Sequence, residues 1–537
     1  MTNAVVATAL KAVSEQPEAA LYGAVAKTVE ASSGWLDAFT VWVDKVDGIV
    51  CGIPLIVAIL VTGILLTCIL RLHHLFNLKN AFRYMFHTEE GTDGDVSAFG
   101  ALCTALSATI GTGNIVGVAT AIGTGGPGAL FWMEIAAFFG MATKYAEGLL
   151  AVKYREFTPD GRVLGGPFYY IEKGLGRKWK WLAVLFATFG ILAGIMGIGT
   201  VTQIHGITSA TLRFFDPNFA PNDPTTGVAI LSWFGISTTY SWAVVISGLV
   251  VTVATALVVI GGLQRIAKVS SVIVPFMAVL YVVVIAFLLL GNLSKITTAL
   301  ELIVRAAFNP AAFTGGMVGS ILIAMQNGIA RGIFSNEAGL GSAPIAAAAA
   351  KTNEPARQGL VCMTGTFIDT IVICTMTGLA IVVTGAWEPS LGLRGVDITI
   401  VAFSRGLSFL GPKSGILSGF FLMTSLTFFA FTTILGWDYY SEKCLEYLVD
   451  PKRTWVVKFY RFLYVAVVFV GPYLTVKVVW GLADTFNGLM ALPNLVAIIL
   501  LSPVVWRVTK DFLQRQHQVS HCSGERQEGK RHRSREG

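Results

Sequence analysis

Long apolar stretches are the feature that most constrains the fold of this chain. They recur along nearly its whole length, and each holds about 20 mostly apolar residues, enough to cross the ~30 Å hydrocarbon core of a bilayer as a helix. Of the 537 residues, 54% are hydrophobic and only 13% are charged, whereas soluble domains carry about 25% charged residues. The sequence therefore predicts an all-α polytopic membrane protein.

The apolar stretches divide into eleven predicted spans. Lys and Arg concentrate in the connections that follow the odd-numbered spans, for example Arg155, Arg162 and Lys173 after the third. By the positive-inside rule these connections face the cytoplasm. We therefore expect a multi-pass protein of the cytoplasmic (inner) membrane, with its N-terminus outside and its C-terminus in the cytoplasm. The predicted spans cover residues 51–71, 97–123, 127–152, 181–208, 239–261, 271–291, 315–349, 358–385, 413–437, 459–479 and 485–508.

Counting the spans predicts an internal repeat. Setting aside an extra N-terminal transmembrane helix at 51–71 leaves ten spans, which divide into five within 97–291 and five within 315–508. Because five crossings is an odd number, the second set must lie inverted relative to the first.

The two ends of the chain are expected to lie outside this repeat. Residues 1–50 are predicted to form an amphipathic, extracytoplasmic segment. Residues 509–537 are predicted to form a basic cytoplasmic tail, disordered from Gln514 onward because that part is polar and highly charged.

Two of the predicted spans are interrupted by glycine and polar residues, one span in each set. The first interruption is Gly111–Asn114, and the second runs from Asn327 through Arg331 to Gly339. In lipid an unpaired backbone group costs several kcal/mol, so a broken helix survives only where protein, ligand or water satisfies it. Such a pair of interrupted spans is the best sequence indication of the binding site in a secondary transporter.

The first interruption offers backbone groups to both an anion and a cation. Gly111 and Gly113 allow the chain to leave the helical conformation and let a ligand approach the backbone. Free N–H groups at the start of the following half-helix can hold a carboxylate. Free carbonyls at the end of the preceding half, near Ser107 and Ile110, can bind a hard cation such as sodium.

Side chains at the same interruption add further oxygen atoms. Thr109 and Thr112 supply hydroxyls, and Asn114 supplies an amide. The alternative is a glycine-rich face for close helix packing. Packing alone explains the glycines but not an asparagine in the middle of a span.

The second interruption is richer in charge. Arg331 and Glu337 need partners in an apolar span, and we favour pairing with each other or with neighbouring loops over direct contact with a substrate. The residues nearer mid-membrane, 317–325 with Gly319 and Ser320, suit the lining of an apolar side-chain pocket.

Other polar residues also lie inside the predicted spans. Gln203 can face a substrate or bridge two helices, because its amide both donates and accepts. Asp369 is predicted to cap or brace neighbouring backbone. Lys144 and Glu147, three residues apart, are predicted to form an ion pair on one helix face.

Thr432 and Thr433 place two adjacent hydroxyls in a span with few other polar atoms. Such hydroxyls usually donate to a carbonyl of their own helix. The alternative interpretation is that the two hydroxyls bind a cation.

The sequence indicates neither an enzyme nor a nucleic-acid-binding protein. It contains no GxxxxGK[ST] phosphate-binding motif, its seven histidines show no metal-ligand spacing, and its seven cysteines form no CxxC pair. We therefore expect no cofactor. The net charge of +7 lies mostly in loops and the tail, where membrane topology accounts for it.

Three motifs give the chain a resemblance to a known family. They are the run from Gly111 (GTGNIVGVATAIGTGGPGALFWM), the segment Gly165-Gly166-Pro167 with the following YYIEKG, and the run from Phe334 (FSNEAGLGSAPIA). Together they resemble the alanine or glycine:cation symporters, also called sodium:alanine symporters, over roughly residues 45–510. One departure is Glu134, where the family usually has tryptophan.

The resemblance implies a LeuT-type five-plus-five inverted repeat and an activity. The implied activity is sodium-coupled symport of alanine or glycine by alternating access, with sodium as the coupling ion. The implied sodium ligands are the carbonyls of Ser107 and Ile110 with the hydroxyls of Thr432 and Thr433. The implied substrate contacts are Thr109, Gly111, Thr112, Gly113, Asn114 and Gln203, with Gly319 and Ile321 closing the side-chain pocket.

Three alternatives differ in mechanism. A proton-coupled amino-acid carrier of the same fold needs a protonatable group, and the nearest one in the sequence is Lys268, at the cytoplasmic edge of its span. A channel should show repeated rings of polar pore-lining residues, and none is visible. A transporter-like sensor should carry a folded signalling domain, for which the tail is too short.

Overall fold

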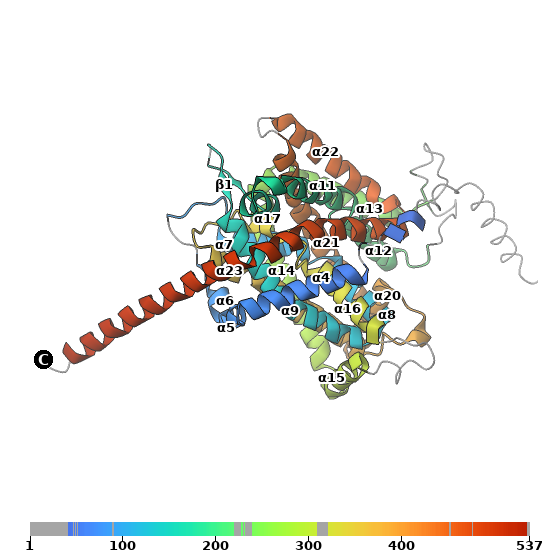
Figure 1. Ribbon diagram of the computed structural model, residues 1–537. Helices are drawn as coiled ribbons and strands as arrows, with labels where there is room; N and C mark the ends of the chain where they lie inside the picture. The colour runs from blue at the N-terminus through green and yellow to red at the C-terminus, as the bar shows by residue number, and fades with distance from the viewer. Residues whose placement is uncertain are drawn as a thin grey trace, which may run out of the picture.

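The protein is described by a computed structural model (Figure 1). The N-terminal segment 1–50 lies outside the described residues apart from scattered positions after residue 40, so the prediction for it lies outside them too. The structure describes residues 52–87, 91–159, 161–219, 239–308, 321–449, 453–474 and 476–533, with scattered positions within 41–50 and 227–230.

The helices of the first half overlap the predicted spans, but the span predicted at 181–208 is divided into two helices, and the helix at 271–291 begins earlier, at Gly262. The second predicted span is broken, and its two helical halves are bent by 61° at the break. The helices are α4 (Ile53–Ile69), α7 (Ala98–Thr109), η1 (Thr112–Asn114), α8 (Val116–Gly125), α9 (Gly128–Lys153), α11 (Lys180–Met196), α12 (Val201–Phe215), α13 (Trp242–Val259) and α14 (Gly262–Leu290).

The second half contains a second break and a span that includes a π-helical segment. Its helices are α16 (Ile321–Asn336), α17 (Ala343–Ala347), α18 (Pro355–Thr366), η6 (Phe367–Cys374, the π-helical segment), α19 (Thr375–Val383), α21 (Ser414–Leu448), α22 (Thr454–Val470), η9 (Gly471–Tyr473) and α23 (Val476–Arg533).

Short elements that the sequence analysis did not predict fill the connections. Most lie outside the long apolar stretches, which is why a search for spans passes over them. They are α5 (His73–Phe76), α6 (Leu78–Phe86), α10 (Pro167–Tyr169), η2 (Tyr170–Gly174), η3 (Arg177–Trp179), α15 (Leu293–Phe308), η7 (Pro389–Leu391), α20 (Val396–Gly406), η8 (Ser408–Leu410) and the antiparallel pair β1 (Glu156–Phe157) and β2 (Val163–Leu164).

The predicted disorder of the C-terminal tail is wrong. Helix α23 continues to Arg533, and Figure 1 shows it projecting far from the body of the molecule. Extending an existing helix needs no new nucleus. The tail is rich in Gln, Arg, Glu and Lys, which are good helix formers.

Eight helices of the described part are long and apolar enough to cross a membrane, and the bent pair α7–α8 makes a ninth span. Helix α4 is apolar but shorter, with 17 residues, and α16 has 16 residues. The chain is therefore a multi-pass membrane protein. The count of eleven spans, which includes α4 and α16, stays a prediction.

Helix α9 lies at the centre of the packing, against α4, α16 and α18. Small residues let these helices approach closely. A Cβ atom at Gly359 of α18 would lie 2.7 Å from the carbonyl oxygen of Tyr145, and one at Gly328 of α16 would lie 2.1 Å from that of Ala129. This packing fixes the interrupted span α16 against an uninterrupted one.

Candidate functional site

The first interruption is a short extended turn between α7 and η1. Helix α7 ends at Thr109, and Ile110 leaves the helical conformation with ψ 93°. In an uninterrupted helix the N–H of Gly111 would donate to the carbonyl of Ser107. It donates instead to Oδ1 of Asn114 at 2.9 Å, which releases the Ser107 carbonyl from that helical bond.

Gly111 is required by the close approach of two side chains. A Cβ atom there would lie 2.5 Å from Oγ1 of Thr433 and 3.1 Å from Oε1 of Gln203. Gly113 is close-packed as well, because its Cβ would lie 3.2 Å from the Cα of Ser335 and 3.4 Å from the ring of Phe334. Both glycines therefore bring other spans against the turn.

Both the oxygen and the nitrogen of the Asn114 side-chain amide form hydrogen bonds within the protein. Its Oδ1 accepts from Gly111, and its Nδ2 donates to Oδ1 of Asp369 at 2.7 Å and to the carbonyl of Asp369 at 3.1 Å. Oδ2 of Asp369 accepts from the hydroxyls of Ser335 at 2.9 Å and Thr370 at 2.8 Å. The carboxylate of Asp369 therefore joins the first interrupted span to the end of α16.

Gln203 bridges two elements. Its Oε1 accepts from the N–H of Thr112 at 3.2 Å, and its Nε2 donates to the carbonyl of Ile198 at 3.0 Å. Ile198 lies in the short break between α11 and α12. Gln203 therefore bridges two elements, and its contact with a substrate stays a prediction.

One of the two adjacent threonines of α21 reaches the broken turn. Oγ1 of Thr433 lies 3.3 Å from the carbonyl oxygen of Ile110 and 3.0 Å from that of Phe429 in its own helix. Oγ1 of Thr432 lies near carbonyls of its own helix and 3.5 Å from Sδ of Met277 on α14.

Close packing of α7 and α21 explains this contact. A Cβ atom at Gly436 would lie 2.7 Å from the backbone nitrogen of Ala108 and 2.8 Å from Oγ of Ser107. The hydroxyl of Ser107 donates to the carbonyl of Thr104 in its own helix at 2.7 Å.

A cavity of about 340 Å³ lies beside the turn. Thr112, Thr202, His205 and Trp480 are among its lining residues, and Arg331 contributes to its wall. Oγ1 of Thr112 is buried without a hydrogen-bond partner among the described residues. That hydroxyl is a candidate contact for a polar ligand in the cavity.

The hydroxyl of Thr109 lies 3.3 Å from the carbonyl of Ala105 in its own helix, and its contact with a substrate stays a prediction. Ile321 begins α16 and is 41% exposed. It stands 14 residues, or roughly 21 Å of helix, before Ser335, which is the residue that packs against the turn. The structure therefore does not bring Ile321 to the site, and Gly319 lies outside the described residues.

The second interruption lies further along the chain than predicted. Helix α16 runs unbroken through Asn327 and Arg331, and the break begins at Glu337, whose φ is 56°. Oε1 of Glu337 accepts from Nε1 of Trp437 at 2.8 Å. Arg331 does not pair with Glu337, because it forms an ion pair of 3.4 Å with Asp484 of α23.

The predicted ion pair between Lys144 and Glu147 does not form in the described structure. Oε1 of Glu147 instead accepts from the backbone N–H of Gly341 at 3.1 Å and from Nδ2 of Asn494 at 2.7 Å. Glu147 therefore holds the second interruption against α9 and α23, because the unwound N–H groups there need an acceptor.

Sequence reasoning missed the contacts of Ser335 and Trp437. Ser335 lies within a predicted interruption, which was the only signal available. The sequence around Trp437 contained no such signal, because a tryptophan in a span is usually interpreted as a packing residue or an interface anchor.

Comparisons with known proteins agree with this architecture. The model of the sodium:alanine symporter family matches residues 36–525. The sodium/alanine symporter AgcS of Methanococcus maripaludis is 44% identical over 88% of this chain and 97% of its own length. An uncharacterized transporter of Haemophilus influenzae is 49% identical over 88% of this chain and 95% of its own length.

A solved structure shows the fold. The crystal structure of MhsT in complex with L-phenylalanine, a LeuT-fold protein, covers 78% of this chain and 99% of its own with a TM-score of 0.50 at 14% identity. The fold is therefore of the LeuT type. With the family model matched over most of its length, this chain belongs to the sodium:alanine symporter family of amino-acid:cation symporters.

Proposed function

We propose that this protein couples the entry of sodium to the uptake of small neutral amino acids, alanine and glycine foremost, by alternating access. The observation that carries the proposal is the broken turn, where the carbonyl of Ile110 faces the hydroxyl of Thr433 across 3.3 Å. In this proposal 97–291 and 315–508 are the two inverted five-helix sets, and the cytoplasmic membrane holds the N-terminus outside.

The chemistry of the turn supports a sodium site. The carbonyl of Ser107 has lost its helical partner, and that of Ile110 lies beyond the end of α7. The hydroxyl of Thr433 can donate to Phe429 and still turn its lone pairs toward a cation. Thr432, one residue away, can supply a fourth oxygen after a change of rotamer. Hard oxygen ligands of this kind suit sodium.

The N–H side of the turn supports a carboxylate site. Gln203 now supplies an acceptor to the N–H of Thr112, and an amino-acid carboxylate can take that place at the start of η1. The unpartnered hydroxyl of Thr112 lies beside it. In this proposal Asn114 holds the shape of the turn rather than the substrate itself.

Close packing around the turn supports selection by size, because the ring of Phe334 lies 3.4 Å from the position of a Cβ on Gly113. Adding a methylene or two to a ligand in a filled pocket costs about 1–3 kcal/mol. Alanine, glycine and serine are therefore expected to bind, whereas leucine is not.

One observation favours a second candidate, the proton-coupled carrier. The carboxylate of Asp369 is fully buried and bonded directly to the turn, so it can exchange a proton there. It is better placed than Lys268, which is exposed near the start of α14. A relative from Bacillus subtilis, 34% identical, is described as a putative sodium/proton-dependent alanine carrier protein.

Uptake of labelled alanine into proteoliposomes tests these proposals. We expect uptake against its gradient with sodium outside, none with potassium in its place, and none with a pH gradient alone. Unlabelled glycine should compete and leucine should not. Uptake driven by the pH gradient without sodium would favour the proton carrier, and competition by leucine equal to that of alanine would contradict the small pocket.

A further inference from the structure

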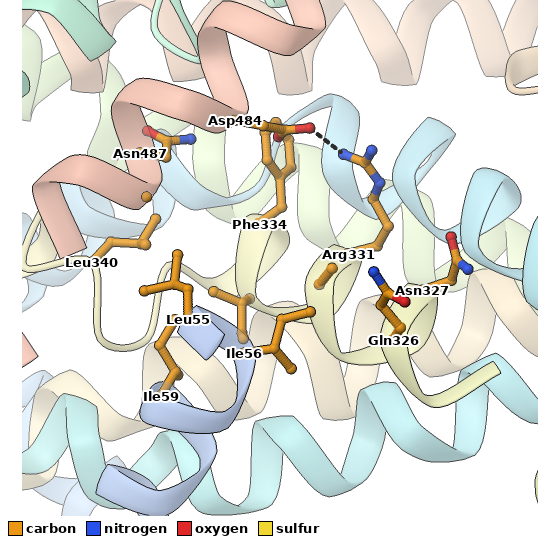
Figure 2. Close-up of a pocket in the computed structure, with 13 residues that line it drawn as sticks. Leu55, Ile56, Ile59, Gln326, Asn327, Arg331, Phe334, Leu340, Asp484 and Asn487 are labelled. Carbon is orange, nitrogen blue, oxygen red and sulfur yellow. Dashed lines mark ion pairs between the residues drawn. The ribbon is translucent and has the colours of Figure 1, made fainter. Parts of the chain in front are cut away.

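A second cavity, of about 200 Å³, lies between α4, α16 and α23 (Figure 2). Helix α4 belongs to neither predicted set of five spans. Arg331 contributes to the walls of this cavity and of the one beside the broken turn, so the two lie on either side of its side chain. A molecule of liquid water takes up about 30 Å³, so the cavity has room for a small organic molecule.

The wall formed by α16 and α23 is polar. Nη1 of Arg331 pairs with Oδ2 of Asp484 at 3.4 Å, and both side chains are largely buried. One turn further along α23 lies Asn487, which Figure 2 shows on the same side of the cavity as Asp484.

The amide of Asn487 points to a missing ligand. Its side chain is only 5% exposed, and within the described part of the chain neither Nδ2 nor Oδ1 has a hydrogen-bond partner. Buried amides without partners are rare in native proteins, because each unpaired group costs about 1–3 kcal/mol. A ligand with both a donor and an acceptor would satisfy this amide.

The opposite wall is apolar. Leu55, Ile56 and Ile59 of α4 face the polar wall across the cavity, and Leu340 closes one end (Figure 2). A matching ligand carries a negative and a positive group at one end and a short apolar group at the other.

We propose that this cavity is a second binding site for a small zwitterionic amino acid, distinct from the transport site at the broken turn. The ligand carboxylate meets Arg331, its ammonium group meets Asp484, and its side chain lies against α4. The amide of Asn487 completes the polar contacts. The inference rests on the proposed function only in its choice of alanine as the probe.

The position of the second site allows its ligand to regulate transport. The Arg331–Asp484 pair ties α16 to α23, and the guanidinium also lies over the rings of Phe334 and Trp480, 5.7 and 5.6 Å from their centroids. A ligand that draws both charges toward itself loosens this tie. Because Phe334 packs against the broken turn, occupancy of the second site changes transport.

Equilibrium binding of labelled alanine to the purified full-length chain tests the proposal. Leu55→Trp fills the cavity from α4, and Val61→Trp, on a 53% exposed position of the same helix, is the matched control. We expect two alanine molecules per chain for the wild type and for Val61→Trp, and one for Leu55→Trp. Asn487→Leu removes an amide without partners, so it should keep the fold and weaken the second site at least 10-fold.

A variant of the transport site separates this inference from the proposed function. Asn114→Ala should retain one bound alanine, and Asn114→Ala/Leu55→Trp should bind none. Failure of transport with the second site intact would count against the proposed function alone. A single bound alanine in the wild type that Asn114→Ala abolishes and Leu55→Trp retains would overturn the second site, whatever transport shows. Unchanged binding by both Leu55→Trp and Asn487→Leu would overturn it as well.

Discussion

Asn114 donates a hydrogen bond of 2.7 Å to the carboxylate of Asp369, although the two residues lie 255 positions apart in the chain. The other oxygen of the same carboxylate accepts from Ser335 at the end of α16. One buried carboxyl group therefore connects both interrupted spans, and neither can move away from the other without breaking a hydrogen bond to it. In the proposed transport cycle this carboxylate couples the two interruptions.

Asn114→Ala should severely weaken alanine uptake while the protein still folds and inserts. The change removes the acceptor for Gly111 and a donor to Asp369, and losing one such bond costs about 1–3 kcal/mol, roughly 5- to 150-fold in affinity. Uptake in proteoliposomes measures the effect, with the monodisperse elution of the purified variant as control. Normal uptake by a well-folded variant would contradict the proposed site.

Ser335→Ala should also lower uptake, and its effect should not add to that of Asn114→Ala. Both side chains donate to Asp369, and residues that share a partner show coupling energies of about 0.5–3 kcal/mol. The double-mutant cycle, measured on apparent alanine affinity, checks this. Strict additivity of the two effects would mean that the carboxylate does not connect the spans.

Thr433→Ala should raise the sodium concentration needed for half-maximal uptake by roughly 10- to 150-fold, since an oxygen that contacts a charge contributes about 1.5–3 kcal/mol. Thr432→Ala should have a smaller effect on the sodium requirement, because the Thr432 hydroxyl lies near Met277 and not at the broken turn. Thr427→Ala is the control, since this hydroxyl bonds the carbonyl of Met423 in its own helix. Equal sodium requirements for Thr433→Ala and Thr427→Ala would exclude Thr433 as a ligand.

Gly436→Ala should destabilise the protein by about 1–3 kcal/mol and abolish sodium-dependent uptake. Its methyl group would lie 2.7 Å from the backbone of α7, so the two helices must separate at the proposed sodium site. Gly365→Ala, whose nearest neighbours would be 3.8 Å away, should be neutral or slightly stabilising. Thermal unfolding in detergent compares the two, and equal melting temperatures would contradict the close packing.

The sequence predicted the features that depend on local composition. Spans follow from the length of an apolar stretch, and the broken turn follows from glycines beside an asparagine in the middle of a span. The second interruption was predicted to begin at Asn327, yet the helix continues. Nδ2 of Asn327 donates to the carbonyl of Ile323, and Arg331 finds Asp484, so polar residues alone did not break α16.

The contacts of polar side chains could not be predicted, because the fold decides them. Asp369 was expected to cap or brace neighbouring backbone, whereas its carboxylate accepts from the side-chain hydroxyl of the adjacent Thr370. Its bond with Asn114 depends on a partner from another span. Ile321 was expected at the site, and the register of α16 brings Ser335 and Phe334 there instead.

The central claim is tested most directly by asking whether an alanine gradient drives the movement of sodium. Proteoliposomes are given an inward gradient of unlabelled alanine and equal sodium on both sides, and the entry of labelled sodium is followed over time. Symport through the broken turn predicts that the alanine gradient drives sodium inward although the sodium concentrations on the two sides are equal. It also predicts that Thr433→Ala loses this movement of sodium. Alanine entry without any movement of sodium would contradict the account.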